Sequence, residues 1–463
     1  MLVALWILCQ SLLGVDDDAL ARGRAIYRTG EGIEAVLPGG ERVDARQLAC
    51  IQCHRSDGRG GWEAGVVVPN IRPERLGASY GVRDGLGHWR PRYTREKLAS
   101  AIREGQSSAG ERLHAVMPRY VLGGEELEAL LDYLAILGTG PVPGVTAETI
   151  RIATVLPKEA GGGSGSVGSV LKAFFAEINA RGGVHGRRID WSPLDEIGGT
   201  DDVLALVANG GAAASPDRLE AFERRDVPVI GPLTFDPRPR DADGIFYVLA
   251  PLDVQVRGAV AAIRDESERA TLIVGESAEC ERLEDVLRRE AERLGLTLTD
   301  EPEAGARVIV LGDAELFARV AEEIEGPRFV AWTVLLGGRV PDPVGGLDRV
   351  MPPLAEGLSS DGESVSFRQV ADRLELEPQH RTMCLAAYAA ARVLVAGLEK
   401  AGRELDRGKL VMALTELSRL ETGVSPGLTY GRFDRLGVEG ALIVRTDGTG
   451  RVIGARFREV ESR

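Results

Sequence analysis

Two cysteines separated by two residues, with a histidine directly after the second, form the most chemically specific stretch of the sequence, CIQCH at 50–54. Cys50 and Cys53 have the spacing at which two thiols bond covalently to haem, while the adjacent imidazole of His54 ligates the iron. A structural zinc site takes four protein ligands, and the chain has no second Cys-x-x-Cys pair. A thioredoxin-like redox pair needs a neighbouring βαβ pattern, whereas this region is predicted to be helical and rich in loops. The motif therefore predicts one covalently bound haem c.

A second axial ligand for the iron is expected in the stretch HAVMPRY at 114–120. An electron-transferring haem usually takes Met or His on the face opposite the first histidine. Met117 stands before Pro118 in a predicted loop, which is a poor setting for a core methionine. His114 and His88 are the competing ligands, and histidine would give a lower reduction potential than methionine. Met117 is the expected ligand.

Two amphipathic helices are predicted on either side of these residues. DDALARGRAIY begins with acidic residues, which suit a helix N-terminus, and its apolar residues recur at helical spacing. GGEELEALLDYLAILG carries an apolar stripe that ends at Gly138 and consists of Leu127, Leu130, Leu131 and Leu134. Gly23 would let the two helices approach closely, with Tyr27 and Tyr133 adding bulk around the crossing.

From Asp18 to Gly138 the chain resembles a class I cytochrome c domain, since GRAIY, CIQCH, VPNI, MPRY and LLDYLAIL occur in the family's order. The resemblance implies an all-α domain over 16–138. It implies that the carbonyl of Pro69 faces the proximal imidazole and orients it. The haem-binding residues implied are Cys50, Cys53, His54 and Met117. RTGEGIEAVLPGGERVDARQLA, at 28–49, is an insertion relative to the family and is expected to cover a haem edge or form a partner surface.

The first residues, MLVALWILCQSLLG, form an apolar run before the acidic VDDD, as in a secretory signal peptide over 1–14. The run is short for a bilayer, and no later stretch is expected to supply the roughly 20 apolar residues of a membrane helix. The bulky residues before Cys9 argue against a lipid anchor there. We therefore expect a periplasmic protein without a membrane span.

The 463 residues are 44% hydrophobic and 27% charged, an ordinary globular composition for about two to four domains. The formal net charge of -14 argues against nucleic acid as a partner. Cys280 and Cys384 stand alone in the sequence. They are either bridged in an oxidising compartment or remain buried thiols.

Glycines and prolines in LGTGPVPGVTAETI, at 137–150, exclude a continuous helix, so a linker is predicted over 139–148. Beyond it, predicted strands alternate with helices, which indicates an α/β architecture with parallel sheets, in two lobes over 149–463. The strand segments are IRIATVLP, RRIDWSPL, VPVIGP, GIFYVLA, ATLIVGE, RVIVLG and RFVAWT. Short strands and Asp-Gly turns near the C-terminus predict an antiparallel tail.

A Gly-x-Gly-x-x-Gly match at Gly163, Gly165 and Gly168 follows the first of these strands, with Asp190 as a candidate ribose acid. In a dinucleotide-binding fold the glycine turn leaves the strand at once, whereas four residues, PKEA, intervene here. Nucleotide binding is therefore not predicted. The Gly/Ser stretch is expected to be a loop.

The second domain is similar to the periplasmic solute-binding proteins of branched-chain amino-acid ABC transporters, which have the type I binding-protein fold. The likeness rests on IRIATVLP, FFAEINARGGVHGRRIDW, VPVIGPLTFDP and YGRFDRLGVEGALIV. It implies two α/β lobes that close over a small solute. Ser166, Ser215 and Thr234 lie in or near the loops that hold the solute in that family, unless their hydroxyls only cap helices or satisfy loops. The family's aromatic residue is absent from GESAECERL, near Cys280.

The sequence favours an exported single-haem cytochrome that passes electrons between periplasmic donor and acceptor proteins, with a second domain that senses a ligand or docks a partner. The alternative is a binding protein for a small-molecule solute in which haem senses or gates capture. A haem that serves only as a structural staple is the third hypothesis. No Ser-His-Asp or carboxylate constellation is identifiable, so no enzyme activity is expected.

Overall fold

The computed structural model describes residues 17–55, 57–63, 66–78, 82–83, 89–156, 163–194, 200–236, 244–302, 307–324, 328–337, 346–358, 366–431 and 434–460. The chain divides into unit 1, Met1–Pro141 with Arg224–Asp226, and unit 2, Val142–Glu223 with Val227–Arg463. The domain limits inferred from the sequence stay predictions. The expected signal peptide 1–14, Cys9 and His88 lie outside the described residues.

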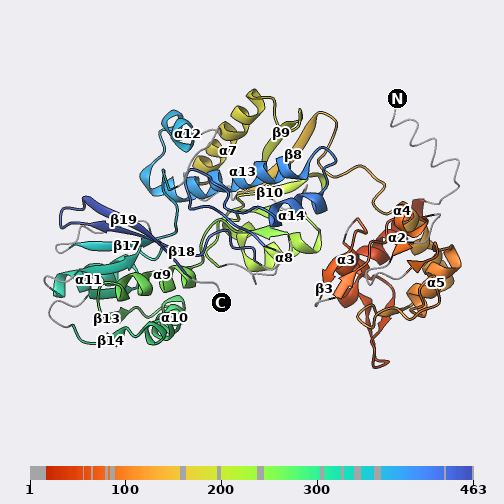
Figure 1. Cartoon of the computed structure of the whole chain (residues 1–463), viewed down its shortest axis with the longest axis horizontal. Coiled ribbons are helices and arrows are strands. Elements are labelled where there is room, and N and C mark those ends of the chain that lie inside the picture. The colour runs from red at the N-terminus through yellow and green to blue at the C-terminus, as the bar shows by residue number, and fades with distance from the viewer. Residues whose placement is uncertain are drawn as a thin grey trace. The chain divides into compact units, whose positions relative to one another are not determined.

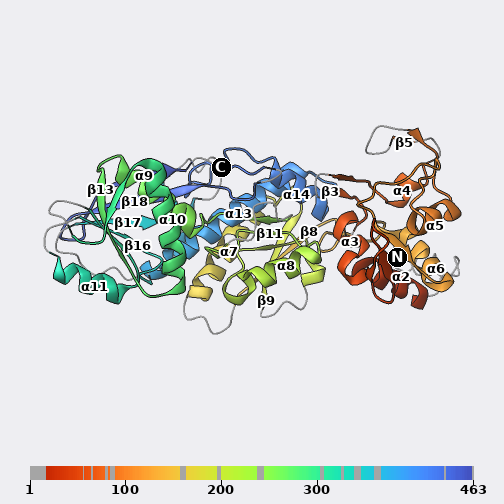
Figure 2. The same cartoon turned by 90° about the horizontal axis from the view of Figure 1, so that it is seen from below.

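Helices α2 (Asp17–Thr29) and α6 (Gly124–Ile136) of unit 1 pack against each other, as the sequence predicts (Figure 2). A Cβ atom on Gly23 would lie 2.0 Å from the carbonyl oxygen of Ala129, so only glycine permits this approach. The ring centroids of Tyr27 and Tyr133 lie 5.5 Å apart beside it. The buried leucines of α6 complete the core, so the predicted helix crossing is confirmed.

The remaining elements of unit 1 correct the expectation of an all-α domain. Its helices are η1 (Ala45–Leu48), α3 (Cys50–His54), α4 (Pro73–Leu76) and α5 (Arg95–Arg103). Its strands are β1 (Glu34–Val36), β2 (Arg42–Asp44), β3 (Gly61–Glu63), β4 (Val66–Val68), β5 (Val82–Arg83), β6 (Trp89–Arg90) and β7 (Arg119–Val121). The insertion supplies β1 and β2, which form the antiparallel sheet β2-β1-β7 with the strand after Met117. An all-α unit is wrong because this segment pairs its backbone with another strand.

One lobe of unit 2 contains a parallel sheet in the order β12-β11-β10-β8-β9 (Figure 1). Its strands are β8 (Thr149–Val155), β9 (Arg188–Leu194), β10 (Ala205–Val207), β11 (Val229–Ile230) and β12 (Ile245–Phe246). Ile152 packs with α7 (Gly163–Ala180) and α13 (Arg381–Ala401), whereas Ala153 packs on the opposite face with α8 (Pro216–Arg224). This alternation buries both faces of the sheet. The lobe also contains η2 (Thr200–Asp202), η3 (Gly211–Ala214), α12 (Phe367–Leu374), η4 (Pro378–His380) and α14 (Arg407–Thr415).

The other lobe contains the seven-stranded sheet β14-β13-β15-β16-β17-β18-β19. Its strands are β13 (Arg269–Val274), β14 (Thr297–Thr299), β15 (Arg307–Leu311), β16 (Phe329–Trp332), β17 (Leu347–Met351), β18 (Gly440–Thr446) and β19 (Val452–Glu459). Its helices are α9 (Leu252–Arg264), α10 (Ala278–Leu294) and α11 (Ala314–Glu323). The strands are parallel from β14 to β17, and β18 and β19 then add an antiparallel hairpin, which confirms the predicted tail.

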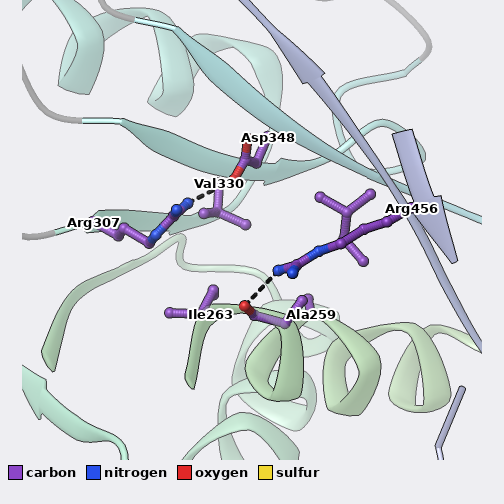
Figure 3. A pocket seen from close by; sticks show the side chains of 8 residues that line it. Ala259, Ile263, Arg307, Val330, Asp348 and Arg456 are labelled. Carbon is purple, nitrogen blue, oxygen red and sulfur yellow. Dashed lines mark hydrogen bonds and ion pairs between the residues drawn. The ribbon is translucent and has the colours of Figure 1, made fainter. Parts of the chain in front are cut away.

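A small pocket lies where this sheet meets α9 (Figure 3). Arg307 of β15 and Asp348 of β17 reach it from either side of β16, while Arg456 extends from β19 to the carbonyl oxygen of Ala262 at 2.6 Å. Polar side chains thus fill the gap between sheet and helix with ion pairs and hydrogen bonds.

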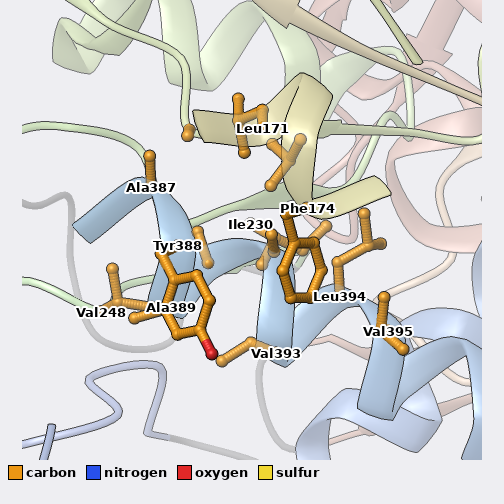
Figure 4. Close-up of a cluster of buried hydrophobic side chains, with 14 of the residues drawn as sticks. Leu171, Phe174, Ile230, Val248, Ala387, Tyr388, Ala389, Val393, Leu394 and Val395 are labelled. Carbon is orange, nitrogen blue, oxygen red and sulfur yellow. The ribbon is translucent and has the colours of Figure 1, made fainter. Parts of the chain in front are cut away.

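Helix α13 is long and apolar enough to cross a membrane, with a mean hydropathy of 1.4, which corrects the expectation that no later segment is. In the structure, 78% of this apolar window is buried. Tyr388 of α13 meets Phe174 of α7 edge to face, with ring centroids 5.4 Å apart (Figure 4). The chain itself therefore covers the apolar surface of this helix.

Helix α7 already begins at Gly163, so the expectation that the Gly/Ser stretch is a loop is wrong for Gly163 to Ser169. Glycine and serine are weak helix formers, but Val167 and Val170 are buried against the lobe core, and this packing stabilises the first turns. All three glycines of the Gly-x-Gly-x-x-Gly match lie within the helix. The geometry of a dinucleotide-binding turn is therefore absent from these residues.

Candidate functional site

The CIQCH motif forms the short helix α3, whose preceding residue is extended and whose following residue, Arg55, has a positive φ of 68°. Side chains three residues apart lie on one face of a helix, so the thiols of Cys50 and Cys53 share a face. Neither cysteine forms a disulfide in the structure, and both are partly exposed. The helix thus presents two unbridged thiols together.

The imidazole of His54 is 8% exposed, and its Nδ1 lies 3.1 Å from the carbonyl oxygen of Pro69. A carbonyl only accepts, so Nδ1 carries the proton and Nε2 keeps its lone pair. Burial lowers the pKa of His54 to about 4, against the opposing effect of the Pro69 hydrogen bond. The ring is therefore neutral at physiological pH, in the tautomer that binds a metal through Nε2. The contact expected from the resemblance is present in the structure.

These donors fit a covalent haem better than a bare metal ion. Burial raises the pKa of the Cys50 thiol to about 11, so the group is a neutral thiol rather than a thiolate. Within the described residues, no group of three or more His, Cys, Asp or Glu side chains could hold a metal ion. Two thiols and one imidazole with a free Nε2 match the set that haem c uses. Haem binding itself stays a prediction.

Met117 lies in a bend before β7 and is partly exposed. Its backbone N–H donates to the carbonyl oxygen of His114 at 3.1 Å, and its own carbonyl accepts from the Arg119 guanidinium. The exposed His114 is engaged locally, because its Nδ1 accepts from the N–H of Val116 at 3.2 Å. Met117 as the iron ligand stays a prediction.

The three residues proposed for solute binding make local contacts in unit 2. Ser166, in the first turn of α7, places its Oγ 3.3 Å from Nδ1 of His380. The Ser215 hydroxyl donates to the carbonyl oxygen of Ala212 at 2.8 Å, and the Thr234 hydroxyl accepts from the N–H of Asp236 at 3.1 Å. None of these contacts shows or excludes a ligand.

The lone cysteines of unit 2 are free and buried. Cys280 lies in α10 and Cys384 in α13. The sequence left open a disulfide bridge or two buried thiols, and the structure contains buried thiols.

Asn209, which the sequence reasoning missed, follows β10 at the carboxyl edge of the five-stranded sheet. It is fully buried, and its Oδ1 accepts from the N–H of Val155 at 2.9 Å. Its Nδ2 has no hydrogen-bond partner among the described residues. Ala208 before it has a positive φ of 51°, a conformation that is strained for alanine. Because ligands of α/β sheets bind beyond the carboxyl ends of the strands, this unpaired donor lies where a solute would be expected.

The seven-stranded lobe has similar atoms at the end of β16. Nε1 of Trp332 and Oγ1 of Thr333 are buried and have no partner in the described part of the chain. In the sequence, only a position at or just after the end of a strand distinguishes these residues and Asn209 from other polar residues. That signal was available for Asn209 in ALVANGG, although the short strand β10 was itself missed.

No family model and no curated protein matches the chain. Among solved structures, it is similar to a fatty acid ABC transporter substrate-binding protein from Thermomonospora curvata, with 19% identity over 69% of this chain and 94% of that chain and a TM-score of 0.49. It is also similar to a branched chain amino acid ABC transporter from Thermus thermophilus with bound valine, with 15% identity over 69% of this chain and 97% of that chain and a TM-score of 0.49. A third similar structure is the substrate-binding protein of a branched-chain amino acid transporter from Streptococcus pneumoniae in complex with isoleucine. It has 15% identity over 68% of this chain and 100% of that chain and a TM-score of 0.47. The names of these three proteins describe transport and substrate binding.

Proposed function

We propose that this protein is a periplasmic small-molecule-binding protein of the two-lobed type that also carries one covalent haem c, through which capture of the solute is sensed or gated. The observation that carries the binding function is the fully buried Nδ2 of Asn209 at the carboxyl edge of its sheet, which has no hydrogen-bond partner in the part of the chain that the structure describes. A buried donor without a partner costs about 1–3 kcal/mol, which a ligand acceptor would recover. The solute is therefore expected to present a carboxylate or carbonyl oxygen.

The test is calorimetric titration of the full chain with a panel of amino acids and short-chain carboxylic acids. We expect at least one to bind, and we expect Asn209→Ala to weaken that binding about tenfold or more, because the hydrogen bond to the ligand is lost. Asn179→Ala is the matched control, since its amide is already satisfied by the backbone of Ile189. Binding to none of the panel, or equal binding by Asn209→Ala and wild type, would contradict this site.

The haem would be held by thioether bonds at Cys50 and Cys53 and by Nε2 of His54. Bound there, haem supplies a one-electron couple. The chain's own contribution is orientation: Pro69 fixes the imidazole tautomer through the 3.1 Å contact, and burial keeps the ring neutral. The structural neighbours do not bear on this part of the proposal.

Electron transfer between periplasmic redox partners is the second candidate function. The observation that favours it is the same His54–Pro69 contact, because a fixed axial imidazole suits a haem that must reorganise little between oxidation states. The two candidates differ in one outcome: a haem that only transfers electrons has a reduction potential unaffected by solute.

Met117→Ala tests the distal ligand. In haem-loaded protein, we expect the methionine-to-iron charge-transfer band to disappear and the reduction potential to fall, because thioether ligation favours ferrous iron. Absorption spectra and redox titration measure both effects. Met412→Ala, at a methionine of unit 2 that is 62% exposed, is the matched control and should leave the spectrum unchanged. Absence of the band from wild type, with a low-spin spectrum that is lost in His114→Ala, would assign the ligand to His114.

A further inference from the structure

The insertion at 28–49 is the part of unit 1 that the proposed haem site does not itself explain. It forms β1, β2 and η1 and then runs directly into Cys50. Strand β1 pairs antiparallel with β7, so that Ala35 stands opposite Tyr120. Strand β7 begins two residues after Met117, the expected distal ligand. The insertion therefore connects the start of α3, the proposed haem-attachment helix, to the segment that carries Met117.

Tyr120 makes this connection with a side chain as well as with the backbone. It is 7% exposed, and its hydroxyl donates to the carbonyl oxygen of Leu48 at 2.7 Å, two residues before Cys50. Burial raises the pKa of Tyr120 well above its ordinary value, so the hydroxyl remains a donor. One side chain therefore joins the start of α3 to the strand that follows Met117.

A second tyrosine holds the other end of α3. Tyr27 of α2 is fully buried, and its hydroxyl donates to the carbonyl oxygen of Arg55 at 2.5 Å, directly after His54. Burial raises the pKa of Tyr27 well above its ordinary value too. Tyr27 fixes the end of α3 to the crossing of α2 and α6. Tyr120 fixes the start of α3 to residues 113–122 around Met117, the distal segment.

The distal segment is held by further hydrogen bonds close to Met117. The Arg119 guanidinium donates to the carbonyl oxygens of Met117 and Leu113, the latter at 3.2 Å. The guanidinium of Arg103 in α5 donates to the carbonyl oxygen of Leu122, directly after β7, at 2.7 Å. Strand β7 is thus held by β1 on one side and by side-chain donors at both ends.

We propose that the insertion, acting through β1 and Tyr120, sets the position of Met117 relative to the haem-attachment helix, with Tyr120 as the positioning residue. The inference rests on the proposed haem site. The expectation that the insertion covers a haem edge or forms a partner surface stays a prediction. Its consequence is that loosening Tyr120 leaves the haem attached and weakens the bond between Met117 and iron.

The first test compares Tyr120→Phe with wild type in the haem-loaded full chain. Imidazole is titrated as a competitor for the distal position and followed by absorption. We expect haem content to be unchanged and imidazole to bind about three- to tenfold more tightly, the range that loss of one hydrogen bond allows. Tyr133→Phe is the matched control, because Tyr133 contacts the Tyr27 ring and, among the described residues, its hydroxyl makes no hydrogen bond to α3 or to the residues on either side of it. Equal imidazole affinity in all three proteins would overturn the proposal.

A second test does not depend on haem. Hydrogen exchange of backbone amides over 113–122 is measured in the full chain produced without haem attachment. Tyr120→Phe should exchange faster there than wild type, and Tyr133→Phe should not. Equal exchange would show that Tyr120 does not hold this segment, which also overturns the proposal. Absence of haem from wild-type protein would instead contradict the proposed function, so the two failures are distinguishable.

Discussion

Replacing Asp348 with asparagine is expected to lower the free energy of unfolding of unit 2 by about 3–5 kcal/mol, the cost of breaking a buried ion pair from one side. Asp348 is 3% exposed and stands among three arginines. Its carboxylate accepts from Arg445 at 2.8 Å, from Arg307 at 2.6 Å and from Arg328 at 3.4 Å. The amide in the variant is neutral, so it no longer supplies a negative charge that balances the positive charges of the three arginines.

The pH dependence of this effect follows from the pKa of Asp348. Burial alone would raise it, but the hydrogen bonds from Arg445 and the charge of Arg307 outweigh burial and lower the pKa. A lowered pKa in the folded state means that the carboxylate stabilises the fold fully above about pH 4, the unfolded value. That stabilisation is lost as the pH falls through the folded value. The difference between wild type and Asp348→Asn should therefore shrink in acid.

Urea unfolding followed by tryptophan fluorescence measures both effects, because Trp332 is fully buried in the same sheet. Glu268→Gln is the control: Glu268 is 83% exposed and lies 3.9 Å from Arg264, so its removal should change stability by less than about 1 kcal/mol. A loss in Asp348→Asn no larger than in this control at neutral pH would refute the assigned role.

Replacing Gly23 with alanine is expected to destabilise unit 1 by about 1–3 kcal/mol or more, the usual cost of overpacking. The new Cβ would lie 2.0 Å from the carbonyl oxygen of Ala129 and 2.9 Å from Cβ of Tyr133. Backbone cannot move aside as a flexible side chain can, so α2 and α6 must separate. Separation would also move Tyr27 away from Arg55.

Gly165→Ala is the matched helical control, because nothing lies within 4 Å of its added Cβ. Alanine there should be neutral or stabilising by up to about 1 kcal/mol. Thermal unfolding monitored by circular dichroism compares the two. If Gly23→Ala were as stable as Gly165→Ala, the close helix crossing would be wrong.

Features with a periodic or chemical pattern were predictable from the sequence. The leucine stripe of α6 and the small residue at Gly23 predicted the helix crossing, and buried apolar runs predicted most of the longer parallel strands. The contact between His54 and Pro69 was predicted from a family resemblance carried by the motifs. In each case, a local pattern or a known motif specified the outcome.

Features that depend on distant partners were not predictable. Glu34–Val36 pairs with Arg42–Asp44 and also with the distant Arg119–Val121, and no pattern in three residues indicates the distant partner. The first turns of α7 are helical because of burial, despite weak propensity. That Nδ2 of Asn209 has no partner among the described residues is a property of its surroundings, which only the folded chain defines.

The central claim is that this chain carries one covalent haem c, and the pyridine haemochrome spectrum of denatured, purified protein tests it most directly. The full chain is exported from a host with haem-attachment machinery, alongside a Cys50→Ala/Cys53→Ala control. We predict a c-type haemochrome at one haem per chain that survives denaturation and is absent from the control. Wild-type protein without covalent haem under these conditions would contradict the account.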